Sequence, residues 1–222
     1  MGLQAGAYSP LSHAHARLPR KCRSLLAGPC IRPGVTFKPL SQATERRPIH
    51  TRTIVCEGFE RDDGLFDIDA RLVDTKSFSF EHRKRGTVEA GSPVHDLRLR
   101  LTIDKDRVVR DIETSSDVAP YGDCQTVSPA YKALIGAKLS LGWRRAVNEA
   151  VGGVKGCTHL RELLMPVATV AFQTMEGGQK AANRALDPNA PAPYFMNQCK
   201  AWSASGKLVG ELYPRFRIQP VE

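Results

Sequence analysis

The stretch LRLRLTID, residues 97–104, decides the fold of this chain. Its apolar side chains alternate strictly with polar or charged ones: Leu97, Leu99, Leu101 and Ile103. Alternation of period two predicts a β-strand with one buried face and one solvent face. Such half-buried strands are typical of antiparallel sheets that are covered on one side. We therefore expect further strands on both sides of this stretch.

Upstream, two strands are predicted at Thr51 to Glu60 and Leu65 to Lys76, with a hairpin turn at Asp63-Gly64 between them. Residues 77–92 are charged and glycine-containing, and are expected to form an exposed turn or loop. Downstream, a tight turn at residues 104–106 leads to a strand from Arg107 to about Thr114. In the second strand one face is apolar: Phe66, Ile68, Ala70 and Leu72. These elements predict an antiparallel meander.

The pattern then changes to that of helices. Ser128 to Gly136 predicts a short helix, and Leu141 to Val151 predicts a second one. Thr158 is the expected N-cap of a third helix with a wide apolar face. Pro166 lies inside that helix and is expected to kink or split it, because proline removes a backbone hydrogen bond.

The end of the chain is expected to be less regular. After Gly177-Gly178 comes a connector rich in proline, alanine and asparagine, Ala181 to Pro193, and residues 194–217 are expected to form a hairpin or tail over the domain. Strands followed by helices predict an α+β fold, with helices packed on one face of the sheet. We expect a single domain over residues 49–217.

The net charge of +9 comes almost entirely from the first part of the sequence. Residues 1–50 hold eight basic residues and one acidic residue, a net +7, whereas the other 24 basic and 22 acidic residues give +2. Because non-specific phosphate binding needs clustered charge on a folded face, we find no specific nucleic-acid signature. No apolar run reaches 18 residues, so no membrane span is expected.

Residues 1–48 are rich in proline, glycine, serine, alanine and arginine, and we expect this basic extension to be disordered. Its composition resembles a targeting peptide, but an extension from a mis-assigned start is the interpretation we favour. The six cysteines do not form a compact disulfide framework. A reducing cytoplasm with free thiols is therefore the expected location.

The residues of most chemical interest are in the segment GCTHL, residues 156–160. It places Cys157 and His159 two positions apart, where a glycine-rich loop meets the start of a helix. Unpaired backbone amides and the helix dipole favour the thiolate form of a cysteine there.

Other ligand-type side chains lie upstream, at the edges of predicted elements. His95 and Asp96 open the clearest strand, and Cys124 lies in a loop before the first helix. If strand and helix starts meet at one end of the domain, His95 or Asp96 could join Cys124, Cys157 and His159 around a metal ion. Zinc or iron would suit such nitrogen and sulfur ligands. Packed or surface residues without any metal are the alternative.

A second hypothesis makes Cys157 a nucleophile with His159 or His95 as its base and Asp96 orienting the imidazole. Side chains two apart on a helix point in different directions, so Cys157 would have to lie in the loop. The substrate would be a small acyl or aromatic compound. A non-catalytic binding module is a third hypothesis.

The ordered part resembles a bacterial family catalogued as domain of unknown function 2889. The similar stretches include residues 47–52, 56–58, 61–67, 93–96, 142–144 and 156–160. A fainter resemblance, at the level of the fold, is to iron–sulfur scaffold proteins of the NifU/IscU type, which implies metal ligands before a strand and at helix starts. This chain departs from that pattern, with His95 where a cysteine is expected and Cys-x-His in place of adjacent His-Cys. Neither resemblance specifies a substrate, partner or oligomeric state.

Overall fold

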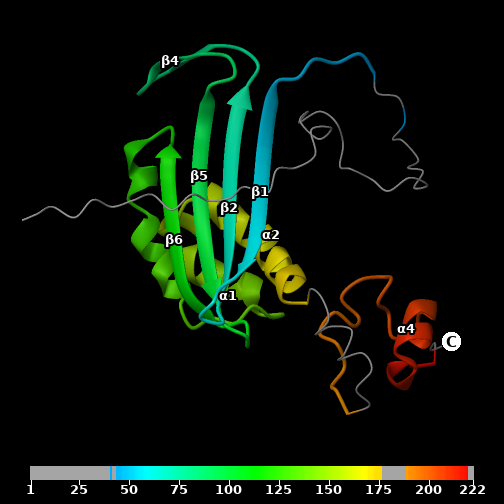
Figure 1. Cartoon of the computed structure of the whole chain (residues 1–222). Coiled ribbons are helices and arrows are strands. Elements are labelled where there is room, and N and C mark those ends of the chain that lie inside the picture. The colour runs from blue at the N-terminus through cyan, green and yellow to red at the C-terminus, as the bar shows by residue number, and fades with distance from the viewer. Residues whose placement is uncertain (1–40, 42–43, 177–188, 220–222) are drawn as a thin grey trace, which may run out of the picture. The chain divides into compact units, whose positions relative to one another are not determined.

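The strand predicted at residues 97–103 is an inner strand of a four-stranded antiparallel sheet (Figure 1). The computed structural model describes residues 41, 44–176 and 189–219. The sheet has the order β1-β2-β5-β6 and consists of β1 (His50–Glu60), β2 (Phe66–Lys76), β5 (Pro93–Ile103) and β6 (Val109–Val118). The predicted antiparallel meander and the α+β class are confirmed. Gly64 has φ of +82°, as the hairpin turn between the first two strands requires.

One part of the strand prediction was wrong. Residues 77–92 contain a second, two-stranded sheet of β3 (Phe80–His82) and β4 (Gly86–Val88), where we expected an exposed turn or loop without strands. Strands of three residues are too short to show a recognisable alternation of apolar and polar side chains. Pairing across the turn therefore decides this structure, with Phe80 opposite Val88.

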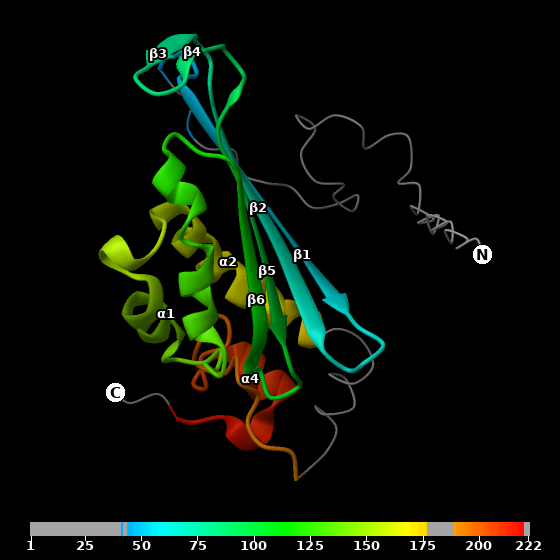
Figure 2. The same ribbon diagram turned by 90° about the vertical axis from the view of Figure 1, so that its left-hand side faces the viewer.

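The helices lie on one face of the four-stranded sheet (Figure 2). They are the 3₁₀ helices η2 (Gly122–Gln125), η3 (Ser128–Leu134) and η4 (Gly153–Lys155), and the α-helices α1 (Trp143–Val151) and α2 (Thr158–Met175). The first predicted helix is thus of the 3₁₀ type. Trp143 is buried, and its indole N–H donates to the carbonyl of Leu164 at 2.9 Å, which joins α1 to α2.

Two predictions concern helix α2, a kink or split at Pro166 and an N-cap at Thr158. The helix runs unbroken from Thr158 to Met175, so Pro166 does not split it. A proline in a helix interior costs about 3 kcal/mol, and we attribute its tolerance to the buried face that α2 packs on the sheet: Leu160, Leu163, Leu164, Val167, Ala168 and Ala171. The N-cap is Cys157 rather than Thr158, with φ −86° and ψ 129°.

The core is the space between the sheet and these helices. Alternate residues of β2 and β5 point into it, including Ile68, Leu72, Leu97 and Leu101, each with no exposed surface. At Gly58 the backbone of β1 approaches α2 so closely that an added Cβ would lie 1.8 Å from Thr174 Oγ1. A glycine is therefore needed where the edge strand meets this helix.

Of the hairpin or tail expected at residues 194–217, the structure shows no hairpin of strands. Residues 189–219 contain two short helices, α4 (Lys207–Leu212) and η5 (Pro214–Phe216), and no strand. Aromatic packing takes the place of strand pairing here, because Phe195 contacts both Trp202 and Tyr213. The ring of Tyr194 stacks on Phe172 of α2 at 4.5 Å.

Among the described residues, those from Arg47 onward form one compact unit. The predictions for residues 1–40, for residues 42 and 43, and for most of the connector at 181–193 lie outside the described residues. Among the described helices, none has both the length and the apolar character needed to cross a membrane.

Candidate functional site

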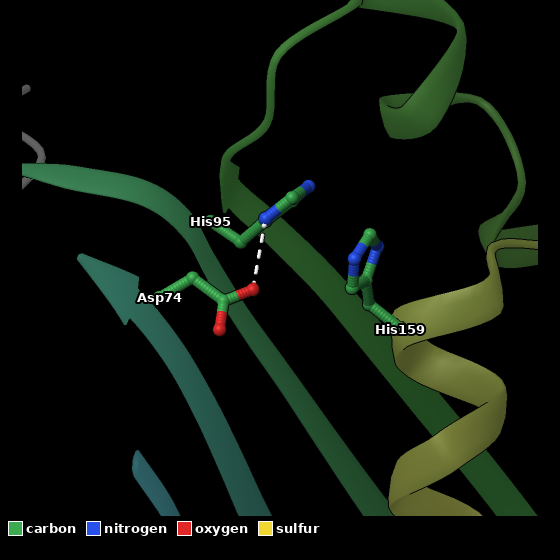
Figure 3. Close-up of side chains that lie close together, drawn as sticks. All are labelled: Asp74, His95 and His159. Carbon is green, nitrogen blue, oxygen red and sulfur yellow. Dashed lines mark hydrogen bonds and ion pairs between the residues drawn. The ribbon is translucent and has the colours of Figure 1, made fainter. Parts of the chain in front are cut away.

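A row of polar side chains crosses three strands on the helix-covered face of the sheet. Arg52 of β1 pairs in register with Asp74 of β2, and Asp74 pairs with His95 of β5. Asp74 follows Ile68, Ala70 and Leu72 at every second position, so it continues the apolar face of its strand. His159, from the first turn of α2, faces this row (Figure 3). The row and His159 together place four charged or titratable groups at the border of the core.

The carboxylate of Asp74 is the centre of this arrangement. Its side chain is only 1% exposed. One oxygen, Oδ1, accepts hydrogen bonds from Arg52 Nε at 2.8 Å and from His50 Nε2 at 3.2 Å. The other, Oδ2, bonds with Arg52 Nη2 at 2.8 Å and His95 Nδ1 at 3.0 Å. A carboxylate has about four acceptor sites, so these contacts fill them.

The charges around Asp74 keep it ionised. Burial, the largest influence, raises the pKa of Asp74, but the bonds and positive charge of Arg52, with smaller contributions from His95 and His50, lower it further. The net result is a pKa below the ordinary value of 3.8. The third nitrogen of Arg52 donates to Glu162 of α2 at 2.5 Å, so this guanidinium links β1, β2 and α2.

The imidazoles of His95 and His159 lie against each other. Their ring centroids are 3.9 Å apart, with an angle of 36° between the planes. Burial is the main cause that lowers the pKa of both rings below 6.5. The neighbouring His159 lowers the pKa of His95 further, and the positive charge of Arg52 lowers that of His159. Both rings are therefore neutral at neutral pH, and each has one nitrogen lone pair able to bind a proton or a metal ion.

Cys157 is close to His159 because it lies just outside the helix. As the N-cap it has an extended backbone, and its Sγ is 3.8 Å from His159 Nδ1. Tyr131, which is fully buried, donates its hydroxyl to the Cys157 carbonyl at 3.0 Å. At Gly156 an added Cβ would lie 2.8 Å from the carbonyl oxygen of Val151, so the turn is tightly packed. These contacts fix the start of α2.

Two of the predicted site residues lie elsewhere. Asp96 follows His95 in the strand and so points to the opposite face, where Arg71 binds both its oxygens at 2.8 and 2.6 Å. Cys124 lies in η2, and its carbonyl accepts from the hydroxyl of Ser116. The structure thus places His159 beside both His95 and Cys157, but it does not bring Asp96 to them. Within the described part of the chain, the Cys124 thiol makes no hydrogen bond to these groups.

The described residues contain one group of histidine, cysteine, aspartate or glutamate side chains arranged as metal ligands are. It consists of Asp74, His95 and His159, whose ligand atoms all lie within 4.8 Å of one another. We did not predict Asp74, although its position in the alternating pattern of β2 was a usable signal. An acid that continues an apolar face is either paired or functional.

Comparison with known proteins gives one result. The sequence model of the family described as "Protein of unknown function (DUF2889)" matches residues 50–173, more than half of the 222 residues. The chain belongs to this family. The matched range of this DUF2889 protein includes the strands of the main sheet and almost all of α2, and with them every side chain of the site from His50 to Glu162.

No curated protein and no solved structure matches the chain. The expected resemblance to NifU/IscU scaffolds therefore has no support from these comparisons. The description of the fold, a sheet with helices on one face, therefore comes from this structure alone.

Proposed function

We propose that this DUF2889 protein binds a transition-metal ion, zinc or iron, through His95, His159 and Cys157. The observation that carries the proposal is the pair of adjacent, tilted imidazoles beside Asp74; the ligand atoms of His95, His159 and Asp74 all lie within 4.8 Å of one another. Both imidazoles are in the neutral form that metals bind. Imidazole nitrogen and cysteine sulfur favour metals such as zinc and iron over calcium and magnesium, which prefer oxygen ligands.

Cys157 is the side chain that we assign as third ligand. Its Sγ lies beside His159 but outside the group whose ligand atoms are all within 4.8 Å of one another, so metal binding would have to draw it closer to His95. Sulfur and nitrogen ligands of one tetrahedral zinc ion are separated by about 3.5 Å, given bond lengths of about 2.3 and 2.0 Å. The observed distance of 3.8 Å between Cys157 Sγ and His159 Nδ1 is close to that separation. Three protein ligands leave a coordination position for water or a substrate atom, which is the arrangement of catalytic zinc sites.

We assign Asp74 a different role, although it belongs to the same group. Its four acceptor sites are used by Arg52, His50 and His95, so direct metal binding would displace one of these bonds. A carboxylate that accepts from one ring nitrogen of a metal-binding histidine fixes the ring and raises its basicity. Asp74 would do this at His95 Nδ1, which leaves Nε2 for the metal.

Metal binding to protein purified without a histidine tag tests this proposal. After treatment with a chelator, the protein is titrated with Zn²⁺ by calorimetry and with Co²⁺ by visible absorption. We expect one ion per chain in the wild type and loss of binding in His95→Gln, His159→Gln and Cys157→Ser. Asp74→Asn should weaken binding about 10- to 100-fold, the usual effect of losing a carboxylate partner.

The matched control is His82→Gln, because His82 contacts Tyr121 and lies outside the site. It should bind metal as the wild type does. A wild type that binds neither ion, or a His159→Gln variant that binds as tightly as the wild type, would contradict the proposal. Normal binding by Cys157→Ser would remove the thiol from the ligand set.

A second candidate function rests on the same thiol. Cys157 lies in the loop rather than inside the helix, which is the condition that a thiol–imidazole pair with His159 requires. As a thiol-dependent enzyme, the protein would show one cysteine that an alkylating reagent labels much faster than the others near neutral pH. Uniform slow labelling, or fast labelling that persists in Cys157→Ser, would exclude this function.

We infer a reducing compartment, the cytoplasm of a bacterium, as the setting for either function. The four described cysteines, at positions 56, 124, 157 and 199, are free thiols. Both a thiolate ligand and a thiol nucleophile need a reduced cysteine.

A further inference from the structure

The β3–β4 hairpin lies beyond the main sheet, at the end where β2 finishes and β5 begins (Figure 2). Hydrogen bonds hold its turn, because the Arg85 N–H donates to the His82 carbonyl and the Lys84 N–H donates to the His82 ring, both at 3.2 Å. Gly86 follows with φ of +68°, a value that favours glycine. The turn therefore presents the side chains of Arg83 and Lys84 on a fixed backbone.

Carboxylates do not balance the positive charge of this turn. Arg83 and Lys84 are exposed, and neither side chain forms an ion pair with a residue that the structure describes. The guanidinium of Arg85 donates to the carbonyls of Pro93 and Val94, at 3.2 and 3.3 Å, so its partners are uncharged. The arginines of β2 and β5, by contrast, each pair with a carboxylate. The turn is therefore a local cluster of cations that are free to bind an anion.

The acidic residues of the hairpin are held by hydroxyl groups instead of by these cations. Glu81 accepts from the Thr87 hydroxyl at 2.5 Å, and Glu89 accepts from the Ser79 hydroxyl at 2.7 Å. Glu81 and Thr87 are register partners in the two strands. Successive side chains of a strand point to opposite faces, so both lie on the face of the hairpin opposite to Phe80. The face that carries Phe80 is therefore separated from the carboxylate of Glu81.

Aromatic rings lie along the face of Phe80. Phe78 is 42% exposed and contacts Phe80 edge-on, and the Lys76 ammonium lies 5.4 and 5.6 Å from the centroids of these two rings. His82 is two residues after Phe80 in β3 and so shares its face. Tyr121, just before η2, is 54% exposed and lies against His82, with centroids 5.3 Å apart. Exposed rings therefore lie at both ends of this face, each close to cations.

We propose that this end of the molecule binds single-stranded nucleic acid, with its cations on the phosphates and its exposed rings stacked on bases. The basic hairpin surface consists of Lys76, Phe78, Arg83, Lys84 and Tyr121. Its charge is local, so the net charge of only +2 over residues 51–222 does not reveal it. A narrow strand can follow the rings and avoid the opposite face. A membrane fits less well, because segments that enter a lipid surface bury an apolar face, whereas the foremost residues here are charged.

Fluorescence anisotropy of a labelled DNA strand of about 20 nucleotides measures binding to the full, chelator-treated chain, so the proposed metal plays no part. The double variant Arg83→Gln, Lys84→Gln should bind more weakly. It should also lower the slope of log affinity against log salt concentration by about 1.4, since each phosphate contact on a single strand contributes about 0.7. Tyr121→Ala should weaken binding at least about 5-fold, the lower end of the effect of one stacked base. Tyr121→Phe keeps the ring and should bind as the wild type does.

Two comparisons make the result specific to this surface. The double variant Lys105→Gln, Lys138→Gln removes the same charge at the other end of β5, where both lysines are exposed, and should bind as the wild type does. The basic residues at 1–50 are present in every variant, so they cannot cause a difference between the two double variants. A duplex of the same sequence should bind more weakly than the single strand, because its bases are already stacked. Circular dichroism checks that each variant is folded.

A wild type that does not bind the strand would overturn the proposal. Equal affinity of the two double variants would also overturn it, because binding would then depend on total charge or on another surface. Unchanged binding by Tyr121→Ala would remove the stacking on which the choice of a single strand rests. Vesicles of phosphatidylserine and phosphatidylcholine test the membrane alternative: binding to vesicles but not to the strand, lost in Arg83→Gln, Lys84→Gln, would assign the surface to lipid instead.

Discussion

Replacement of Asp74 by asparagine tests the central claim about the site, that one buried carboxylate holds together β1, β2, β5 and the start of α2. The substitution keeps the shape of the side chain but removes its charge and turns one acceptor oxygen into a donor NH₂ group. Two of the four groups that donate to Asp74 would then face the new NH₂ donor instead of an oxygen acceptor. The side chain is 1% exposed, so water cannot replace these partners.

The expected cost is about 3 kcal/mol in the free energy of unfolding. Removal of one partner from a buried ion pair costs about 3–5 kcal/mol. The lower end applies here, because the Arg52 side chain is 31% exposed and keeps its bond to Glu162. Arg52 therefore loses one carboxylate but is not left buried and unpaired.

Chemical denaturation of the chelator-treated protein measures this cost without any contribution from metal. We expect a lower midpoint of unfolding with an unchanged dependence on denaturant concentration. The control is Asp69→Asn, because Asp69 forms a comparable two-bond pair with Arg100 but is exposed, and its loss should cost about 1 kcal/mol or less. A cost below about 1 kcal/mol for Asp74→Asn would refute the reasoning, since it would mean that the carboxylate contributes no more than a surface pair.

Three further predictions concern the framework around the site. Gly58→Ala should destabilise the protein by about 1–3 kcal/mol, because the added methyl group overpacks against Thr174. Thr174→Ala in the same chain should recover part of that loss, measured as unfolding free energies in a double-mutant cycle. Additive effects of the two substitutions would contradict the close approach. Tyr131→Phe should lower the free energy of unfolding by only about 1 kcal/mol. The Cys157 carbonyl loses its hydroxyl donor but still accepts from the Arg161 N–H at 2.9 Å. A loss well above about 2 kcal/mol, measured by chemical denaturation, would show another role for the hydroxyl. Asp104→Ala should cost about 1–3 kcal/mol at neutral pH, because this buried carboxylate accepts from the N–H groups of residues 106 and 108 and from Arg110. Burial raises the pKa of Asp104, but these bonds lower it below 3.8 overall. The difference in stability between wild type and variant should therefore be constant above pH 3.8 and shrink as the pH falls through the lowered native pKa. A difference that persists in acid would contradict this assignment.

Local patterns were enough to predict much of the fold. The alternation at Leu97 to Ile103 and the turn at Gly64 reflect interactions between residues that are close in sequence. The same reasoning failed for β3 and β4, whose three-residue strands are held by pairing with each other. At Pro166 the helix does not split, one of the two expected outcomes, because burial of one face of α2 outweighs a lost backbone bond. In both cases tertiary contacts outweighed the local preference.

The site shows the same division. Cys157 and His159 could be predicted as a pair because both depend on the start of one helix, and His95 because it opens a strand. Asp96 was predicted next to His95, but successive residues of a strand point to opposite faces, and the structure pairs it with Arg71 instead. The carboxylate that His95 does contact, Asp74, is on the neighbouring strand, 21 positions away in the sequence.

The sequence by itself determined the period of each long element, and with it the antiparallel sheet, the helices that come after it, and the position of a thiol and an imidazole at a helix start. Only the tertiary structure decided which polar groups meet. The register between β1, β2 and β5 aligns Arg52, Asp74 and His95, and the packing of α2 on these strands brings His159 to them. The physical reason is that side-chain direction within an element depends on local geometry, whereas contact between elements depends on register and packing across the whole core.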